Sequence, residues 1–413
     1  MAASERAARA SAAATPATTT PATTTPITRA ACALRSVSRT LARWLPRLLK
    51  GGLGGGVAMQ AATAATLPEE RSELTYHLYD GGGVKASGPA LLVRKNIADR
   101  WAVSGSYYVD AVSNASIDVV TSASPFKETR TAADLGVDWL VRDTLLSATL
   151  YRSTEPDYEV DTIGADVTHE VFGGMTTVNL GFSRSRDVVM RKNEPNFRDR
   201  ASHWQYRFGV TQVLSPRWLA SLNAEAINDE GYLGSPYRVA YVFGAPVRER
   251  VPRTRSSRAI KLRTIYDFGD GASRTALRAE YRHYWDNWEI KAGTAEIGIS
   301  RYLPREWGAP GTWLVDAAAR FYSQDKALFY SDNATSETLF VSRFRQLSTF
   351  KSNSLVLKAT WTPTHETLTR YDARFSFSFE RKQFRYSDFT DLRTGAPYGY
   401  DANVLALTAS ARF

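Results

Sequence analysis

Five histidines, all beyond residue 64, are the first side chains to test for catalytic or metal-binding spacing. They are His77, His169, His203, His283 and His365, and none forms a metal-ligand spacing such as HExxH. His283 is followed by Asp286 and Glu289, and a histidine beside carboxylates could serve hydrolysis. The same segment, Tyr284–Trp288, holds two tryptophans and a tyrosine, which are more typical of a membrane interface. Hydrolysis therefore stays a minority hypothesis, and we do not expect an enzyme.

A second group of reactive side chains lies between residues 110 and 124, where carboxylate, amide and hydroxyl oxygens are frequent. Asp110, Asn114 and Asp118 are weak candidates for a Ca²⁺ site, because Ca²⁺ takes six to eight oxygen ligands. Their spacing matches no metal-binding loop, and Asp, Asn and Ser side chains also cap turns. We therefore favour a structured loop here and keep the metal site as the weaker alternative.

An arginine-rich segment follows near the middle of the chain. Its five arginines are Arg248, Arg250, Arg253, Arg255 and Arg258. Guanidinium groups suit phosphates, including those of lipopolysaccharide, or an anion path if the segment folds inward. A solvated loop is at least as acceptable an interpretation.

Residues 1–64 predict an export signal. Residues 1–28 are an Ala/Thr/Pro tract that cannot bury a core. Arg35–Lys50 then resembles a positively charged n-region, Gly51–Met59 a weak apolar core, and Ala62–Ala64 a cleavage site. We expect residues 1–64 to be disordered or cleaved, and residues 65–413 to form the folded domain.

Removal of this leader changes the chemistry of the protein. It holds eight basic residues and one acidic residue, most of the net charge of +10, so no basic domain remains for nucleic acid. It also holds the only cysteine, Cys32, so residues 65–413 lack disulfides and thiolate metal sites. No phosphate-binding glycine loop before a helix and no CxxCH motif occurs, and we expect no cofactor.

Alternation of apolar and polar residues dominates the chain from residue 71 onward. In the last such segment Leu405, Leu407, Ala409, Ala411 and Phe413 share one face. We count about sixteen segments, and fourteen is nearly as acceptable. Their approximate ranges are 71–79, 89–95, 101–109, 129–141, 145–151, 159–171, 178–182, 206–213, 219–227, 260–268, 276–284, 294–302, 314–322, 355–361, 371–379 and 405–413.

The connections between these segments alternate in length. The short ones are Asn96–Arg100, Arg142–Thr144, Phe172–Gly174, Ser215–Arg217, Gly269–Ala272, Pro304–Gly311 and Pro363–Thr367. Most of the others are long: Asp110–Glu128, Asp187–Asp199, Asp229–Arg255, Gln324–Asn353 and Ser387–Asp401. Outer-membrane barrels have short periplasmic turns and long extracellular loops, with both termini periplasmic.

No stretch approaches the roughly 18–20 apolar residues of a membrane helix, whereas 9–11 alternating residues suffice for a membrane strand. We therefore predict an all-β, transmembrane, antiparallel up-and-down β-barrel in the outer membrane of a Gram-negative bacterium. Phe413 would be the terminal residue of its C-terminal insertion signal for the barrel-assembly machinery.

Charged residues inside the strand patterns must avoid lipid, where Arg or Lys costs about 2–4 kcal/mol at the midplane. We therefore expect eleven of them to face the lumen: Glu225, Arg263, Arg278, Glu280, Arg282, Glu296, Arg320, Lys358, Asp372, Arg374 and Glu380. Both signs occur, so opposing charge ladders across a water-filled pore and a closed, salt-bridged interior both stay open.

The segment Tyr107–Arg130, together with Gly81–Gly83 and Gly88–Lys95, resembles an uncharacterised bacterial domain-of-unknown-function family. The resemblance covers roughly residues 71–413. Its members are predicted outer-membrane barrels, so it implies the same fold and no activity.

These observations favour a passive channel or transport-related barrel with a charged lumen. The alternative is a non-conducting structural barrel that anchors a periplasmic or surface partner, such as an envelope lipoprotein. A lumen filled by residues 110–128 or 229–255 would favour the alternative. Outer-membrane lipid and lipopolysaccharide are the other expected partners.

Overall fold

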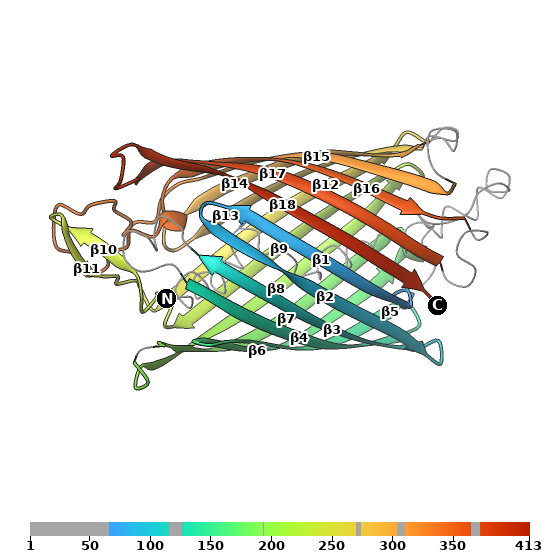
Figure 1. Cartoon of the computed structure of the whole chain (residues 1–413). Coiled ribbons are helices and arrows are strands. Elements are labelled where there is room, and N and C mark those ends of the chain that lie inside the picture. The colour runs from blue at the N-terminus through green and yellow to red at the C-terminus, as the bar shows by residue number, and fades with distance from the viewer. Residues whose placement is uncertain (1–65, 115–125, 193, 270–273, 304–309, 365–371) are drawn as a thin grey trace.

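The computed structural model describes residues 66–114, 126–192, 194–269, 274–303, 310–364 and 372–413. These residues form one closed barrel of sixteen antiparallel strands, with the last strand paired to the first (Figure 1). The predicted fold class is confirmed, and the count of about sixteen strands is correct. In the part of the chain that is described, no helix is long and apolar enough to cross a membrane.

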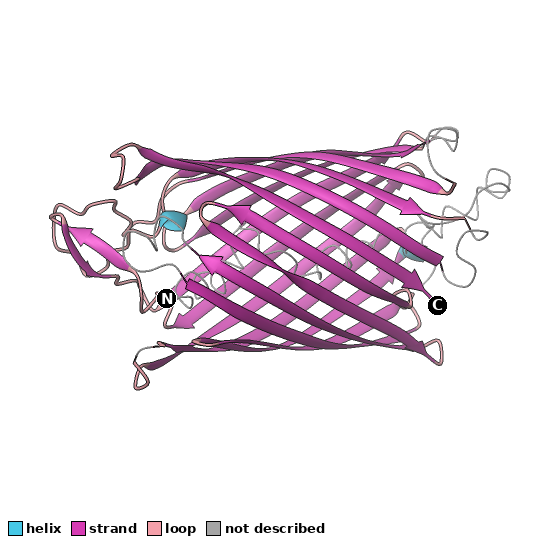
Figure 2. Ribbon diagram, viewed as in Figure 1, coloured by secondary structure: helices cyan, strands magenta, loops and turns pink. Residues whose placement is uncertain are grey.

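The strands are longer than the sequence patterns suggested. The barrel strands are β1 (Arg71–Gly81), β2 (Val84–Ile97), β3 (Trp101–Asn114), β4 (Phe126–Val141), β5 (Thr144–Glu155), β6 (Tyr158–Val171), β7 (Thr176–Met190), β8 (Arg198–Ser215), β9 (Trp218–Gly231), β12 (Thr254–Asp267), β13 (Thr275–Asp286), β14 (Lys291–Leu303), β15 (Thr312–Gln324), β16 (Phe350–Thr362), β17 (Asp372–Thr390) and β18 (Pro397–Arg412). A two-stranded hairpin, β10 (Val239–Val242) with β11 (Ala245–Arg248), lies outside the barrel wall. Two short 3-10 helices, η1 (Phe172–Gly174) and η3 (Arg345–Leu347), complete the described elements (Figure 2).

The last strand closes the barrel. Strand β18 pairs with β1 over ten residues, from Ser72 opposite Ala411 to Gly81 opposite Ala402. Thr75 and Thr408 face each other in this register, and their hydroxyl oxygens lie 2.9 Å apart. Closure leaves no strand edge unpaired, which a β-structure in lipid requires.

The two ends of the barrel differ. The turn end holds Phe413 and tight connections such as 98–100, 142–143 and 216–217. The loop end holds the long connections 232–253, which carries β10 and β11, and 325–349 (Figure 1). We call residues 325–349 the mouth loop.

Two connections predicted to be long are partly strand, and residues 115–125 of the first lie outside the described residues. Strands β3 and β4 extend to Asn114 and from Phe126, and β17 and β18 extend to Thr390 and from Pro397. The strands are therefore longer than the 9–11 residues that a membrane needs, and beyond the apolar band their side chains still point alternately inward and outward. The turn between β1 and β2 is also tight, because Gly82 and Gly83 both adopt positive φ, of 59° and 77°.

Large apolar side chains cover the outer face of the barrel. On β1, Leu74 and Tyr76 are more than half exposed, whereas His77, the next residue, is buried inside. The same alternation places Leu407 and Phe413 on the outer face of β18 and its end. Near the turn end, stacked outward rings form part of an aromatic girdle: Trp101 with Trp139, and Trp313 with Trp361. An apolar outer band with an aromatic girdle defines a transmembrane barrel.

Candidate functional site: the lumen wall and the mouth

The strand registers place all eleven charged residues predicted for the lumen on the inward face. Each is in register with a neighbouring inward residue, for example Arg263 opposite Glu280, and Glu296 opposite both Glu280 and Arg320. Lys358 lies opposite Asp316, and Arg374 lies opposite Ser410. The lumen of this barrel is therefore lined by ionised groups.

Apart from the Arg255–Asp286 ion pair and from Asp267, which pairs with Arg274 in the adjacent turn, the inward charges of β12 to β17 are predominantly positive. We call this surface the basic wall. Its basic residues are Lys261, Arg263, Arg278, Arg282, Arg320, Lys358, Arg374 and Lys382, and its carboxylates are Glu280, Glu296, Asp316, Asp372 and Glu380. At its centre Glu296 accepts from Arg278 at 3.3 Å and from Arg320 at 2.6 Å. This carboxylate thereby ties β13, β14 and β15 together.

Arg263 and Lys358 of the basic wall have no such partner. Among the residues that the structure describes, neither Arg263 nor Lys358 makes an ion pair, and the Nε atom of Arg263 is buried without a hydrogen bond. Asp316, opposite Lys358 in the register, instead accepts a hydrogen bond from Ser300. These two side chains are available to an anionic group that enters the lumen.

The inward charges of β4 to β6 are predominantly negative, and we call this surface the acidic wall. Its carboxylates are Glu128, Asp134, Asp138, Glu155, Asp166 and Glu170, and its single inward arginine in the described residues is Arg130. Asp134 accepts from the Ser106 hydroxyl and Asp138 from the Ser147 hydroxyl. Hydroxyl donors stabilise these carboxylates but leave their negative charge in place.

The two walls face each other across the barrel. Strands β5 and β15 are eight steps apart around the closed sheet of sixteen strands, which makes them diametrically opposite. At about 4.8 Å per strand and a tilt of about 40°, the opposing backbones are roughly 30 Å apart. Side chains cannot reach a partner across such a distance, so the charges of the two walls do not neutralise each other by direct ion pairs.

A first cluster of buried polar side chains lines the loop end, and no sequence motif marks it. His203 lies between two buried aspartates, with Nδ1 2.7 Å from Asp229 and Nε2 3.1 Å from Asp187. Asp187 also accepts from the Tyr158 hydroxyl, and from Ser185 at 2.7 Å. Only the protonated imidazole donates from both nitrogens, so this geometry fits the cationic form of the ring. The cluster ties β6, β7, β8 and β9 together.

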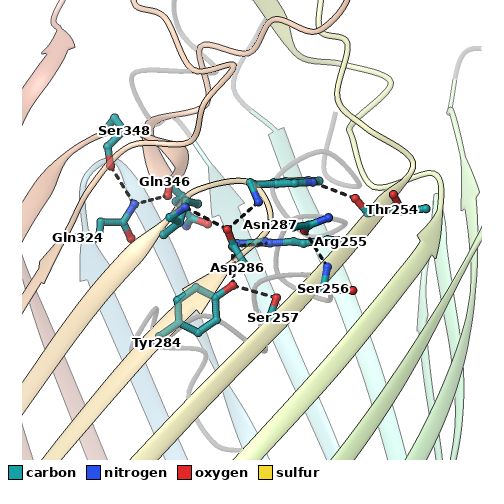
Figure 3. A network of polar contacts seen from close by, with 12 residues as sticks. Thr254, Arg255, Ser256, Ser257, Tyr284, Asp286, Asn287, Gln324, Gln346 and Ser348 are labelled. Carbon is teal, nitrogen blue, oxygen red and sulfur yellow. Dashed lines mark hydrogen bonds and ion pairs between the residues drawn. The ribbon is translucent and has the colours of Figure 1, made fainter.

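A second cluster continues around the same end on β12 and β13 (Figure 3). The Arg255 guanidinium donates to Asp286 from Nη2 at 2.6 Å and from Nε at 2.9 Å, and it also bonds the Tyr284 hydroxyl. The second oxygen of Asp286 accepts the backbone N–H groups of Trp288 and Ile290, at 2.9 and 3.0 Å. Asp286 therefore shapes the β13–β14 turn, a structural role.

The mouth loop is anchored to the inner wall of the barrel. Gln324 donates from Nε2 to the carbonyl oxygens of Gln346 and Ser348, at 2.9 and 2.8 Å (Figure 3). The Tyr330 hydroxyl donates to the Asp388 carbonyl at 2.9 Å, and burial raises the pKa of this tyrosine above its usual range. Apolar residues complete the attachment by packing in one cluster: Ala327, Tyr330, Phe344 and Leu347 against Phe350, Phe384, Tyr386 and Phe389.

The mouth loop is also joined to the hairpin above it. Val242 of β10 pairs with Ala334, and Arg250 pairs with Val341. Val242, Ala334 and Val341 are buried together, with Ala240, in a small apolar cluster. Figure 1 shows β10 and β11 projecting beyond the barrel rim, so this part of the 232–253 connection extends away from the lumen.

The prediction that five arginines share one outer loop is wrong for two of them. Arg255 and Arg258 belong to β12, because the strand begins at Thr254 and alternates from there. Arg255 points inward, is buried and pairs with Asp286, so it cannot contact lipopolysaccharide. Arg258 points outward and is exposed.

The other three arginines do lie in the 232–253 connection. Arg253 forms an ion pair with Asp199 at 2.8 Å, and Arg250 donates to the Thr338 carbonyl at 2.9 Å. The guanidinium of Arg248 lies 6.0 Å from the centre of the Phe197 ring. These contacts hold the connection together, and they leave the expected anion contact without specific support.

The candidate metal ligands are not gathered into a site. Asp110 is buried on β3 and hydrogen bonds His77 Nε2 at 2.7 Å, a contact shared with the Tyr108 hydroxyl at 3.1 Å. Asn114 ends β3, and Asp118 lies outside the described residues. Among the described residues, no group of three or more His, Cys, Asp or Glu side chains could hold a metal ion.

The candidate hydrolytic pair is separated by the barrel wall. Asp286 points inward to Arg255, whereas His283, three residues earlier, points outward and stacks on Trp285 at 5.5 Å. The expected interfacial belt is also only partly present here, because Tyr284 and Trp288 are buried inside the mouth and only Trp285 faces outward. His169 bonds Thr144 near the turn end, and His365 lies outside the described residues.

Fold and lining together define the class: a transmembrane β-barrel of outer-membrane type with a charged lumen. Residues 189–373 match the model of a family described as a protein of unknown function, DUF3570. The predicted resemblance to an uncharacterised family is thereby confirmed, although the matched residues lie beyond Tyr107–Arg130, the segment that carries the resemblance. No curated protein matches the sequence.

Solved structures with a similar fold are distant in sequence. A bacterial polysaccharide outer membrane secretin is 9% identical, with a TM-score of 0.49, over 83% of this chain and 98% of that one. The siderophore receptor PirA from Pseudomonas aeruginosa is 10% identical, with a TM-score of 0.41, over 86% and 83%. OmpT from Vibrio cholerae is 9% identical, with a TM-score of 0.40, over 83% and 96%. Nothing about function follows from likeness at this level.

Proposed function

We propose that this protein is a passive channel in a bacterial outer membrane, with its loop end outside and its turn end in the periplasm. The observation that carries the proposal is the pair of opposed charged walls. A barrel of sixteen strands is wide enough for an aqueous channel, and charges that cannot pair across it need water. Short turns on the side of the C-terminus support the orientation.

In this proposal the two walls select solutes by their charge, and the mouth loop limits the size of the solutes that enter. An anion entering from outside passes the anchored mouth loop and then meets Arg263 and Lys358, which have no ion-pair partner among the described residues. A cation is drawn to the side of Asp134 and Asp138. Selectivity in such pores follows the charges that line them, and no group needs to change its covalent state. We therefore propose transport without catalysis.

Planar-bilayer recording of the purified protein tests the proposal. We expect discrete conductance steps and a reversal potential that depends on both walls. The double substitution Arg263→Gln and Lys358→Gln should shift the reversal potential toward cation preference. The double substitution Asp134→Asn and Asp138→Asn should shift it the opposite way. Arg301→Gln removes an outward charge from β14 in the same part of the barrel. It is the matched control and should leave the reversal potential unchanged.

A second candidate is a non-conducting barrel that anchors a surface partner. It is favoured by large apolar side chains exposed in the loop-end connections: Phe243 at the β10–β11 turn, and Leu328 and Leu339 in the mouth loop, each about 70% exposed or more. Single apolar residues are common on protein surfaces, so we rank this candidate second. Absence of conductance steps from correctly folded protein would favour it and contradict the channel.

A further inference from the structure

The outer face of the barrel carries a hollow that the lumen does not explain. It measures about 640 Å³ and is lined almost entirely by apolar atoms. Its outward lining residues come from six adjacent strands, β6 to β9, β12 and β13. They are Ala165, Val167, Leu180, Phe182, Tyr206, Phe208, Ala224, Ala226, Arg258, Ile260 and Trp285. We call this hollow the outer groove.

The strand registers explain why a groove forms here. Tyr206 lies opposite Ala226, which lies opposite Arg258, which in turn lies opposite Trp285. One row nearer the turn end, Phe208, Ala224 and Ile260 repeat the order. Two successive outward alanines on β9 thus form a floor between large side chains on the flanking strands, and the lining extends across the strands from β6 to β13.

Two arginines without carboxylate partners flank the groove toward the loop end. Arg258 is exposed on the outer face and makes no ion pair among the described residues. Arg184 stacks its guanidinium 4.1 Å from the centre of the Trp204 ring, and its Nε is buried without a hydrogen-bond partner. Strands β7 and β12 are three steps apart and Arg184 is in register with Ser256, two residues from Arg258, so the two arginine backbones are separated by about 16 Å.

Two other outward arginines of the loop end are neutralised by a carboxylate. Arg381 and Arg385 on β17 both pair with Asp401, at 2.7 and 3.0 Å. Arg258 and Arg184 instead border an apolar surface in the membrane. An arginine on the outer surface costs about 0–1 kcal/mol near an interface and more at greater depth, so a phosphate at this height would stabilise both.

We infer that the outer groove binds one molecule of lipopolysaccharide through its lipid A part. An acyl chain would lie on Ala224 and Ala226, and the phosphates of the sugar headgroup would bind Arg258 and Arg184. Lipid A suits this site because it combines a phosphorylated, extended headgroup with several acyl chains. The site needs the orientation proposed above, with the loop end outside, but it does not need the lumen to conduct.

Native mass spectrometry of the barrel in detergent, with added lipid A, tests the inference. We expect one lipid A to stay bound to each barrel. Arg258→Gln should weaken binding about tenfold, which corresponds to about 1.4 kcal/mol. Ala226→Trp should fill the groove and abolish retention, whereas Ala319→Trp, a matched change on the outward face of β15, should not. Heat-modifiable migration in gels checks that each variant is folded.

Three results would overturn the inference. Retention of lipid A by folded Ala226→Trp would exclude the groove as the site. Equal binding of lipid A lacking both phosphates would exclude the arginines as its ligands. Competition by phosphatidylglycerol at equal concentration would show that any anionic lipid fits. Planar-bilayer conductance is a separate readout, so a result that excludes lipid A binding at the outer groove leaves the channel proposal testable by itself.

Discussion

At the scale of single residues, the loop end is held by charged groups that contact each other inside the wall. His203 and its two aspartates come from β7, β8 and β9, and Arg255 and Asp286 come from β12 and β13. Residues of one cluster are up to 42 positions apart in the sequence, and the spacing of neither cluster resembles a known motif. Only the register, which places the side chains on one face, brings them together.

We predict that His203→Ala destabilises the barrel by about 3–5 kcal/mol, because it leaves two buried carboxylates without their cation. Urea unfolding of the protein in lipid vesicles measures the change. His169→Ala is the control, since that ring makes a single hydrogen bond with Thr144 near the turn end, and its effect should stay within about 1 kcal/mol. Equal stability of the two variants would show that the His203 cluster contributes little.

At the scale of elements, alternation predicts the strands well and their ends poorly. The sixteen apolar-polar segments locate the strands because a strand in contact with lipid on one face must be apolar on that face. Beyond the membrane both faces of a strand contact water or another loop, so the sequence no longer has to alternate between apolar and polar residues. The prediction therefore ended β17 and β3 too early, and it placed Arg255 in a loop.

The anchors of the mouth loop lead to a prediction at this scale. Gln324→Ala and Tyr330→Phe together remove three hydrogen bonds to the barrel wall, each contributing about 1 kcal/mol. We expect faster hydrogen exchange and proteolysis within residues 325–349, with the barrel strands unchanged. Thr338→Ala removes only a contact within the loop and is the control. Unchanged protection in the double variant would show that apolar packing alone holds the loop.

The end of β18 gives a second prediction for an element. Phe413 lies on the outer face at the turn end, and the Lys95 ammonium is 5.0 Å from the centre of its ring. We expect Phe413→Ala to lower the amount of barrel assembled in cells, because the terminal aromatic residue is lost from the expected insertion signal. Lys95→Ala, which leaves the ring in place, should assemble normally. Normal assembly of Phe413→Ala would contradict this role.

At the scale of the whole molecule, charge is distributed around the barrel in a way that the sequence suggested only in part. Alternation was enough to place Glu225, Arg263 and Lys358 inside. It did not reveal that acidic and basic residues occupy opposite walls, because that follows from the strand order and the closure of β18 onto β1. Nor did it reveal the outer groove, which needs the alanines of β9 beside large residues of β8 and β12.

The central claim is that a watery, charged lumen lies inside an apolar outer surface, and two adjacent residues of β16 test it directly. Lys358 faces the lumen and Leu357, which is 45% exposed, faces outward. With Cys32 replaced by serine, Lys358→Cys and Leu357→Cys each provide a single thiol. In lipid vesicles we predict rapid labelling of Lys358→Cys by a charged, membrane-impermeant thiol reagent and none of Leu357→Cys. Labelling of Leu357→Cys with protection of Lys358→Cys would contradict the account.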